Sequence, residues 1–129
     1  MNRWLGKQSE WIYALMRVVV GLLFACHGAQ KLFGLLGGEQ RISDPLMLLG
    51  GIIEFGGGLM VGLGLRAGFA AFLASGMMAV GYFKAHAPWS FWPIVNKGEL
   101  AVLYSFVFLY IASKGSGLLS IDALLGRKK

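Results

Sequence analysis

Apolar residues along this chain fall into long runs that alternate with short polar segments. The first run begins near Trp11 and is followed by Gly37 and Gly38, which are typical of a helix stop. Pro45 opens the second run, and Arg66 marks a tight turn before the third. The pattern predicts four long helices and a tail helix, at residues 11–36, 46–65, 67–86, 93–113 and 118–126.

The start of the fourth helix is inferred from its length. The uninterrupted apolar run at residues 100–113 covers only about 21 Å at about 1.5 Å per residue, which is less than the roughly 30 Å of a hydrocarbon core. Pro93 suits a first-turn position, so the helix is expected to begin there. This start would place Asn96 and Glu99 below the membrane surface.

Composition shows that these helices belong in a membrane. Apolar residues make up 57% of the 129 residues and charged residues 14%, with a mean hydropathy of +0.66. Such a chain is too apolar for a water-soluble domain of this size. We expect a single all-α domain over residues 1–129. It should be an integral membrane four-helix bundle in up-down-up-down order, with a short C-terminal amphipathic helix at the interface.

The positive charge of the chain indicates its topology rather than a nucleic-acid partner. The 12 Lys and Arg residues give a net charge of +6, but they lie at helix ends and tails instead of gathering with aromatic residues on one face. Most of them fall on the side that holds both termini, and positive residues favour the cytoplasm. We therefore expect a multi-pass protein of the inner membrane, embedded in the lipid bilayer, with both termini cytoplasmic and no nucleic-acid partner.

Several polar side chains are predicted to lie at one depth in the membrane. His27 falls roughly 10 Å, Glu54 roughly 12 Å and Glu99 roughly 9 Å from the outer ends of their helices. Lys31 lies one turn above His27, and His86 lies at the outer end of the third helix. An isolated charge at such a depth costs about 2.5–3.5 kcal/mol, so it needs a partner. We expect Lys31 to pair with Glu54 or Glu99, with the two histidines as hydrogen-bonding neighbours.

This polar group has two main interpretations. In the functional one, it hydrogen-bonds or exchanges protons with a carbonyl compound such as a quinone head group. In the structural one, an ion-pair network holds the helices in register. A metal or haem site is a weaker alternative without diagnostic spacing, and no metal is assigned. The candidate ligand and proton site comprises His27, Lys31, Glu54, His86, Asn96 and Glu99.

Two further sets of residues predict structural contacts. Arg17 has few acids in reach, so Asp122 of the tail is expected to fold back and meet it, anchoring the C-terminal helix beneath the bundle. Small residues on the second helix would let a neighbouring helix approach closely. The expected packing positions are Gly50, Gly57, Gly58 and Gly62.

Four segments of the chain resemble successive motifs of the DoxX family of small four-helix membrane proteins. They are RVVVGLLFACHGAQKLFG at 17–34, GGIIEFGGGLMVGLGLRAGFAAF at 50–72, KAHAPWSFWPIVNKGELAVLYSF at 84–106 and GLLSIDALLG at 117–126. Each motif is weak alone, but the combination is specific. The resemblance covers roughly residues 13 to 126 and implies the same four-helix fold.

The resemblance also implies a link to membrane redox chemistry. Some relatives are subunits of a membrane thiosulfate:quinone oxidoreductase, and others are linked to redox complexes that handle thiol stress. We therefore expect a redox-associated, quinone-linked subunit with no cofactor held within the chain and with a membrane or periplasmic redox partner. The alternative is a non-catalytic scaffold or small-molecule-binding accessory protein, and a homo-oligomer is compatible with both. The fold also resembles that of vitamin K epoxide reductase, but Cys26 is the only cysteine, so chemistry based on a cysteine pair is excluded.

Overall fold

A computed structural model describes residues 2–126, and within this range the chain is helical, with no strand. The prediction of an all-α protein is therefore confirmed. In chain order the helices are α1 (Asn2–Lys7), α2 (Ser9–Phe33), α3 (Pro45–Ile52), the π-helical η1 (Ile53–Gly57), α4 (Gly58–Leu63), α5 (Ala67–Gly81), the π-helical η2 (Tyr82–His86), α6 (Pro93–Asn96), α7 (Glu99–Lys114) and α8 (Ile121–Leu124).

Helix α2 is the longest helix of the described chain, and it ends earlier than the sequence predicts. Gly34 adopts a left-handed conformation with φ of 66°, and its backbone N–H donates to the carbonyl of Gln30 at 3.0 Å. Glycine is favoured at this position because it carries no Cβ. The predicted helix over residues 11–36 is thus wrong by three residues at its C-terminal end, because Gly34 stops the helix before Gly37 and Gly38.

Helix α3, η1 and α4 follow one another without a break and match the predicted second helix closely. Asp44 caps the N-terminus, since its Oδ1 accepts from the backbone N–H of Leu46 at 2.9 Å, and Pro45 occupies the first turn. Gly64, with φ of 72°, ends the segment. The third predicted helix, residues 67–86, matches α5 and η2 together. Both segments contain a π turn, which the sequence did not reveal.

The predicted fourth helix over residues 93–113 is wrong as a continuous helix. The chain forms the single turn α6, breaks at Lys97, whose φ is 63°, and restarts as α7. The side-chain oxygen Oδ1 of Asn96 accepts from the backbone N–H of Gly98 at 2.9 Å, which stabilises the break. Within residues 2–126, three helical segments are long and apolar enough to cross a membrane: Ser9–Phe33, Pro45–Leu63 and Ala67–His86. The 16 residues of α7 fall short of that length, so four crossings stay a prediction.

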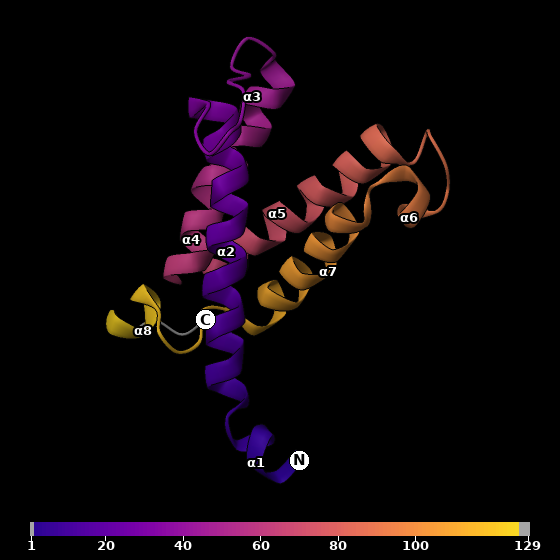
Figure 1. Ribbon diagram of the computed structural model, residues 1–129. Coiled ribbons are helices and arrows are strands. Elements are labelled where there is room, and N and C mark those ends of the chain that lie inside the picture. Colours follow the sequence, from indigo (N-terminus) through magenta and orange to yellow (C-terminus); the bar gives the residue numbers. More distant parts are fainter. Residues whose placement is uncertain (1, 127–129) are drawn as a thin grey trace.

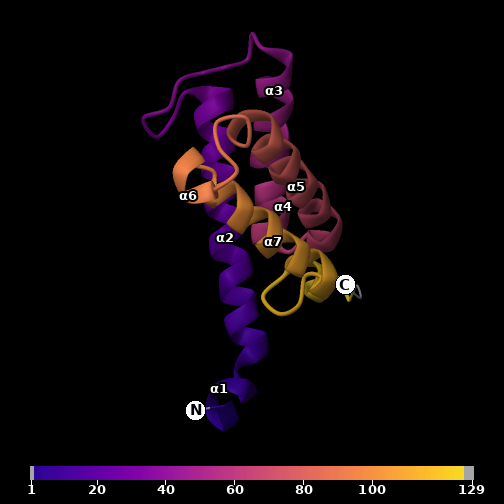
Figure 2. The same ribbon diagram turned by 90° about the vertical axis from the view of Figure 1, so that its right-hand side faces the viewer.

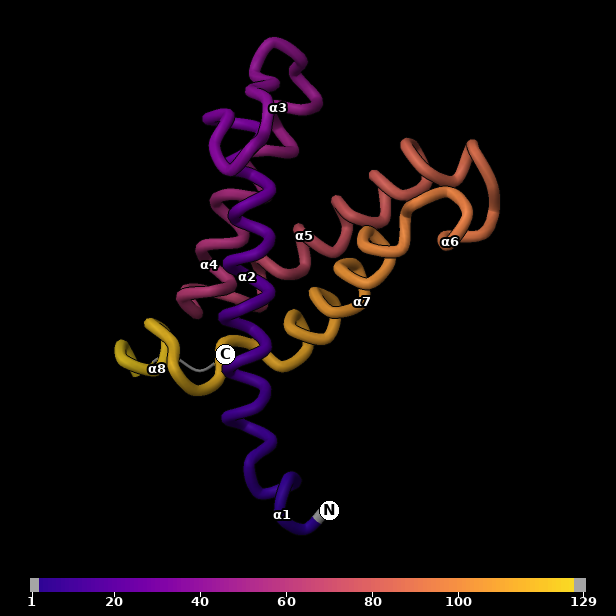
Figure 3. Tube along the Cα trace, viewed as in Figure 1, coloured from indigo at the N-terminus to yellow at the C-terminus, as the bar shows by residue number. Residues whose placement is uncertain are grey.

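The helices form two pairs that diverge from one another (Figure 1). Helix α2 packs along α3, η1 and α4, and α5 packs along α7. The successive long helices alternate in direction, which the trace in Figure 3 makes plain. Helix α1 and the first turns of α2 project beyond the rest of the molecule in both ribbon views (Figures 1 and 2). The tail helix α8 is a single turn, shorter than the predicted 118–126.

The two pairs meet through a core of aromatic and small side chains. The ring of Phe24 on α2 lies 4.6 Å from that of Phe108 and 5.3 Å from that of Tyr104, both on α7. Within the pair formed by α5 and α7, Ser75 Oγ donates to the backbone carbonyl of Ser105 at 2.7 Å, and Ser105 Oγ donates to the backbone carbonyl of Ser75 at 3.1 Å. Buried alanines on α5 allow this close approach; they are Ala67, Ala70, Ala71 and Ala74.

Two of the four glycines predicted to pack do so. A Cβ atom on Gly58 would lie 2.5 Å from the backbone nitrogen of Ala25, and one on Gly62 would lie 3.6 Å from that of Leu22, so both face α2. Gly50 has nothing within 4 Å, and Gly57 meets only a methyl group of its own helix at 3.9 Å. The π turn η1 interrupts the four-residue repeat between Gly50 and Gly58. At that end the neighbouring Gly51 faces α2 instead, because a Cβ on it would lie 2.9 Å from the side chain of Leu32.

Candidate functional site

A cavity of about 240 Å³ lies where α2, η1, η2 and α7 approach one another, and we call it the His27 cavity. Its polar lining comes from side chains far apart in the sequence. The lining residues are Phe24, His27, Lys31, Glu54, Met78, His86, Lys97, Leu100, Ala101 and Tyr104. The structure therefore brings together four of the six residues predicted for the candidate site.

Helical spacing explains how two of the helices line this cavity. On α2, Phe24, His27 and Lys31 are separated by three and four residues, so they share one face. On α7, Leu100 and Tyr104 share a face in the same way. Phe24 and Tyr104 belong both to the aromatic core and to the lining, so the cavity borders the core.

Lys31 and Glu54 form the ion pair at the centre of the site. Lys31 Nζ donates to Glu54 Oε1, which is one of the two pairings that the sequence predicts for Lys31. The side chain of Glu54 is only 3% exposed, whereas that of Lys31 is 30% exposed, so the lysine bridges the buried carboxylate to the surface. The second carboxylate oxygen, Oε2, is buried and has no hydrogen-bond partner among the described residues. Glu54 lies in the π turn η1, and such turns occur frequently at functional sites.

His86 is held in the cavity wall through its Nδ1 atom. This nitrogen lies 3.0 Å from the backbone carbonyl oxygen of Asn96. Because a carbonyl can only accept a hydrogen bond, Nδ1 must carry the proton, which leaves Nε2 available for another partner. The ring also stacks on that of Tyr82, with centroids 6.2 Å apart.

Asn96 supports the site from outside the cavity. Its Nδ2 donates to Tyr82 Oη at 3.0 Å and to the carbonyl of Ser90 at 2.8 Å, while its Oδ1 accepts from Gly98. These bonds engage both the amide nitrogen and the amide oxygen, and they tie together the segment between η2 and α7. The prediction that Asn96 belongs to the site itself is not what the geometry shows, because its side chain positions the loop that holds His86 and does not line the cavity.

His27 faces the interior edge of the cavity. Its ring meets that of Tyr104 edge-on, with centroids 6.1 Å apart. Within residues 2–126 its side chain makes no hydrogen bond to the protein. The imidazole is therefore positioned by packing alone, and its polar atoms can serve a bound molecule.

Glu99 is the predicted site residue that the structure places elsewhere. It is exposed in the first turn of α7 and does not line the cavity. The depth argument predicted a level for this carboxylate but not its direction around the helix, and the chain breaks at Lys97 just before α7 begins. Sequence reasoning missed Lys97 and Tyr104, which do line the cavity. Lys97 lies in a left-handed conformation that L residues adopt at a cost of about 1–2 kcal/mol.

The lining gives the cavity a defined chemistry. Two lysines and one carboxylate leave an excess of positive charge, and two imidazoles add groups that donate or accept according to protonation. Such a set can orient a small polar head group whose apolar remainder lies among the membrane helices. Nowhere in residues 2–126 do three or more His, Cys, Asp or Glu side chains gather in a way that could hold a metal ion.

A second polar cluster joins the tail to α2, and we call it the tail cluster. Arg17 is fully buried, and its Nη1 and Nη2 donate to the backbone carbonyls of Ser116 and Leu119, each at 2.5 Å. Ser116 Oγ donates to Asp122 Oδ2 at 2.7 Å, and the backbone N–H of Arg66 donates to the same oxygen at 2.8 Å. Within the described residues, Ser116 links Arg17 with Asp122, because its carbonyl accepts from Arg17 and its hydroxyl donates to Asp122. The tail is anchored against the bundle, as expected.

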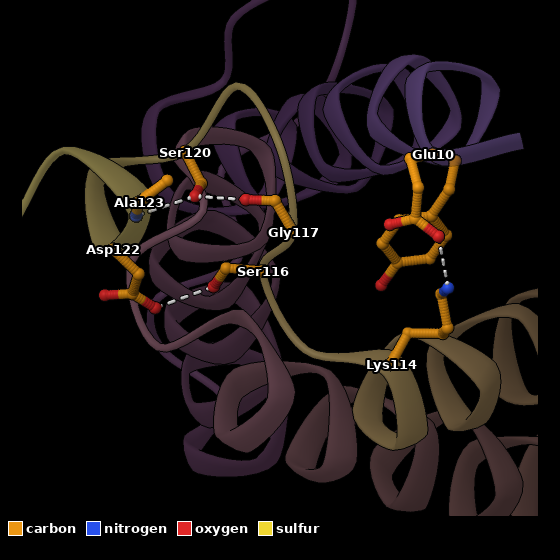
Figure 4. A pocket seen from close by; sticks show the side chains of 8 residues that line it. Glu10, Lys114, Ser116, Gly117, Ser120, Asp122 and Ala123 are labelled. Carbon is orange, nitrogen blue, oxygen red and sulfur yellow. Dashed lines mark hydrogen bonds and ion pairs between the residues drawn. The ribbon is translucent and has the colours of Figure 1, made fainter. Parts of the chain in front are cut away.

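The tail cluster borders a cavity of about 230 Å³ (Figure 4). On one side the hydroxyl groups of Ser116 and Ser120 point to Asp122 and Gly117. On the other side Lys114 Nζ lies 3.0 Å from Glu10 Oε1, an exposed ion pair between the end of α7 and the start of α2. These groups satisfy one another, which is typical of a structural contact.

Comparison with known proteins gives two matches. The sequence profile of the DoxX family matches residues 12–87. An uncharacterized protein of Haemophilus influenzae (strain ATCC 51907 / DSM 11121 / KW20 / Rd) is 38% identical over 125 residues, which covers 92% of this chain and 93% of that protein. No solved structure matches significantly.

Proposed function

Because this chain belongs to the DoxX family of membrane proteins, we propose that it is a quinone-linked subunit of a membrane redox system. The His27 cavity would hold the head group of the quinone. The observation that carries this proposal is the convergence of an ion pair and two imidazoles in one cavity between apolar helices. Ionisable groups within a membrane are costly, and they commonly mark a ligand or proton pathway.

The lining groups suit a carbonyl ligand that exchanges protons. Lys31, Lys97 and His27 can donate hydrogen bonds to carbonyl oxygens, and donors aimed at an oxygen stabilise negative charge that develops there. Reduction of a quinone to a quinol takes up two electrons and two protons. The electrons would come from a membrane or periplasmic redox partner. His86, with Nδ1 fixed and Nε2 available, and Glu54 would pass the protons.

The proposal includes a location for the site. We place the protein in the inner membrane as a multi-pass protein with both termini cytoplasmic, because its positive residues concentrate on that side. The His27 cavity then lies in the periplasmic half. A homo-oligomer is compatible with this arrangement, since Gly50 and Gly57 leave open surface on the second helical segment.

The direct test is to identify what the protein binds. The full chain would be purified in mild detergent and its bound lipids identified by mass spectrometry, followed by titration with decylubiquinone and with menadione. We expect a quinone to bind, and His27→Ala to weaken binding at least about tenfold. The exposed loop residue Glu39 supplies a matched control, since Glu39→Gln changes a carboxylate outside the cavity. Absence of binding by both quinones would contradict the proposal.

A second function is favoured by the pairing of Lys31 with Glu54. A buried ion pair can hold two helices in register without any ligand, and the close contact of Gly58 with Ala25 shows that α2 and α4 already pack tightly. In this case the protein would be a non-catalytic scaffold or accessory protein. Loss of fold when the ion pair is broken by Lys31→Met, with no quinone bound by the native protein, would support this alternative.

A further inference from the structure

We infer that the His27 cavity selects the reduced, hydroxyl-bearing form of its ligand, the quinol, over the quinone. This inference rests on the proposed function and adds a preference between the two redox states. The observation behind it concerns Glu54. This residue is 2% exposed, and its Oε2 atom has no hydrogen-bond partner among the described residues. A buried polar atom without a partner is rare in proteins and calls for an explanation.

Glu54 and Lys31 form an ion pair in which Lys31 Nζ donates to Oε1. A lysine ammonium has three donors and no acceptor, so the carboxylate acts as the acceptor in this contact. An ionised carboxylate can only accept hydrogen bonds. Any group that hydrogen-bonds to Oε2 of Glu54 must therefore be a donor. Neither Lys31, which is bound to the other oxygen, nor any other described residue supplies it.

The two redox states of the ligand differ in this property. A quinone presents carbonyl oxygens, which only accept, whereas each hydroxyl group of a quinol can both donate and accept. Bound quinone would leave Oε2 without a donor and would set two acceptors against each other. Bound quinol can donate one hydroxyl to Oε2 while its oxygen atoms accept from the cationic groups of the cavity, Lys31 and Lys97.

A site that hydrogen-bonds a ligand hydroxyl discriminates strongly against the analogue that lacks it, because the buried polar group of the site is then left unpaired. We expect the quinol to bind at least about tenfold more tightly than the quinone, which corresponds to ~1.4 kcal/mol. Tighter binding of the reduced form also raises the reduction potential of the bound pair, by about 30 mV for each tenfold preference of a two-electron couple.

The test compares three ligands on the full chain in detergent under anaerobic conditions. They are decylubiquinone, decylubiquinol, and the dimethyl ether of decylubiquinol, in which both hydroxyl hydrogens are replaced by methyl groups. Dissociation constants would be measured by isothermal titration calorimetry. The quinol should bind at least about tenfold more tightly than both other compounds. The ether is informative because it keeps the reduced ring and removes only the donors.

A variant of Glu54 then tests whether this residue causes the preference for the quinol. In Glu54→Gln the side-chain amide can donate or accept, so the ratio of quinone to quinol dissociation constants should fall to about one. Glu39→Gln, on the exposed loop, should keep the native ratio. If Glu54→Gln fails to fold, the double variant Lys31→Met with Glu54→Gln removes both buried charges and serves the same purpose.

The outcomes separate the two proposals. Equal binding of the three compounds would overturn the preference for quinol and leave the quinone site standing. Tighter binding of the quinone would also overturn it. A preference that survives in Glu54→Gln would show that another group selects the quinol. Failure of all three compounds to bind would overturn the proposed function together with this inference.

Discussion

Lys31 and Glu54 depend on each other because each would otherwise be an isolated charge at the edge of the apolar interior. Substituting Lys31→Met leaves the Glu54 carboxylate buried without a partner. We expect this variant to lose about 2–4 kcal/mol of stability. The double variant Lys31→Met with Glu54→Gln should lose less, since no buried charge remains. Unfolding followed by circular dichroism in detergent would check this order, and a double variant less stable than the single one would contradict it.

Arg17 contributes through the shape of its side chain as well as its charge. Its planar guanidinium reaches the carbonyls of Ser116 and Leu119 at the same time, whereas a lysine ammonium is a single point charge. Arg17→Lys should therefore loosen the tail and lower the free energy of unfolding by about 1–3 kcal/mol. Limited proteolysis of the C-terminal segment would be faster in this variant. Arg41→Lys, on an exposed loop, should leave proteolysis unchanged.

At the scale of elements, the contact between α2 and α4 depends on glycine at particular positions. A Cβ on Gly58 would lie 2.5 Å from the backbone nitrogen of Ala25 and 2.7 Å from the carbonyl oxygen of Gly21, and backbone atoms cannot move aside easily. Gly58→Ala should thus lower stability by about 1–3 kcal/mol. The adjacent Gly57→Ala should be neutral or stabilise by up to about 1 kcal/mol, because its Cβ meets only an Ile53 methyl at 3.9 Å. Equal melting temperatures for the two variants would contradict this assignment.

The π turns explain why the bounds of two long helices were predicted well although the geometry of the candidate site was not. The apolar runs gave the bounds of α5 with η2 to the residue and those of α3, η1 and α4 to within two residues. Neither run contained a signal for the π turns that hold Glu54 and His86. The break at Lys97 was also missed, because the cap that Asn96 forms with Gly98 depends on local backbone geometry that hydropathy does not report.

At the scale of the whole molecule, the arrangement of the two helix pairs determines which ends lie together. Helix α2 and α7 run in opposite directions, and the tail crosses α2 at Arg17, so the start of α2 and the tail lie toward one end of the molecule (Figure 1). The His27 cavity lies toward the other end of α2, beside η2 and the start of α7.

This arrangement gives a topological prediction. Alkaline phosphatase fused after Gly126, with Arg127, Lys128 and Lys129 kept ahead of it, should be inactive, because the enzyme folds only outside the cytoplasm. A fluorescent protein at the same place should be bright. Phosphatase fused after Gly38, in the loop that follows α2, should be active. The physical reason is the excess of Lys and Arg near both termini. An active phosphatase after Gly126 would reverse the orientation of the His27 cavity and contradict our assignment.

The sequence by itself determined the class of the protein and the bounds of the second and third long helices, and it predicted a depth for the polar residues. These follow from composition, from the length of apolar runs and from helical rise, all of which are local or additive quantities. On the same grounds, the partner of Lys31 was narrowed to two carboxylates, those of Glu54 and Glu99. Depth along a helix can be counted from the sequence, and direction around it can be estimated only while the helix stays regular.

Only the tertiary structure decided which polar groups meet. It placed Glu99 outside the cavity, brought in Lys97 and Tyr104, and joined Arg17 to Asp122 through Ser116. It also left Oε2 of Glu54 without a partner, which no pattern of residues could reveal. These outcomes depend on helix rotation, on π turns and on loop geometry, where a change of one residue in register turns a side chain by about 100°.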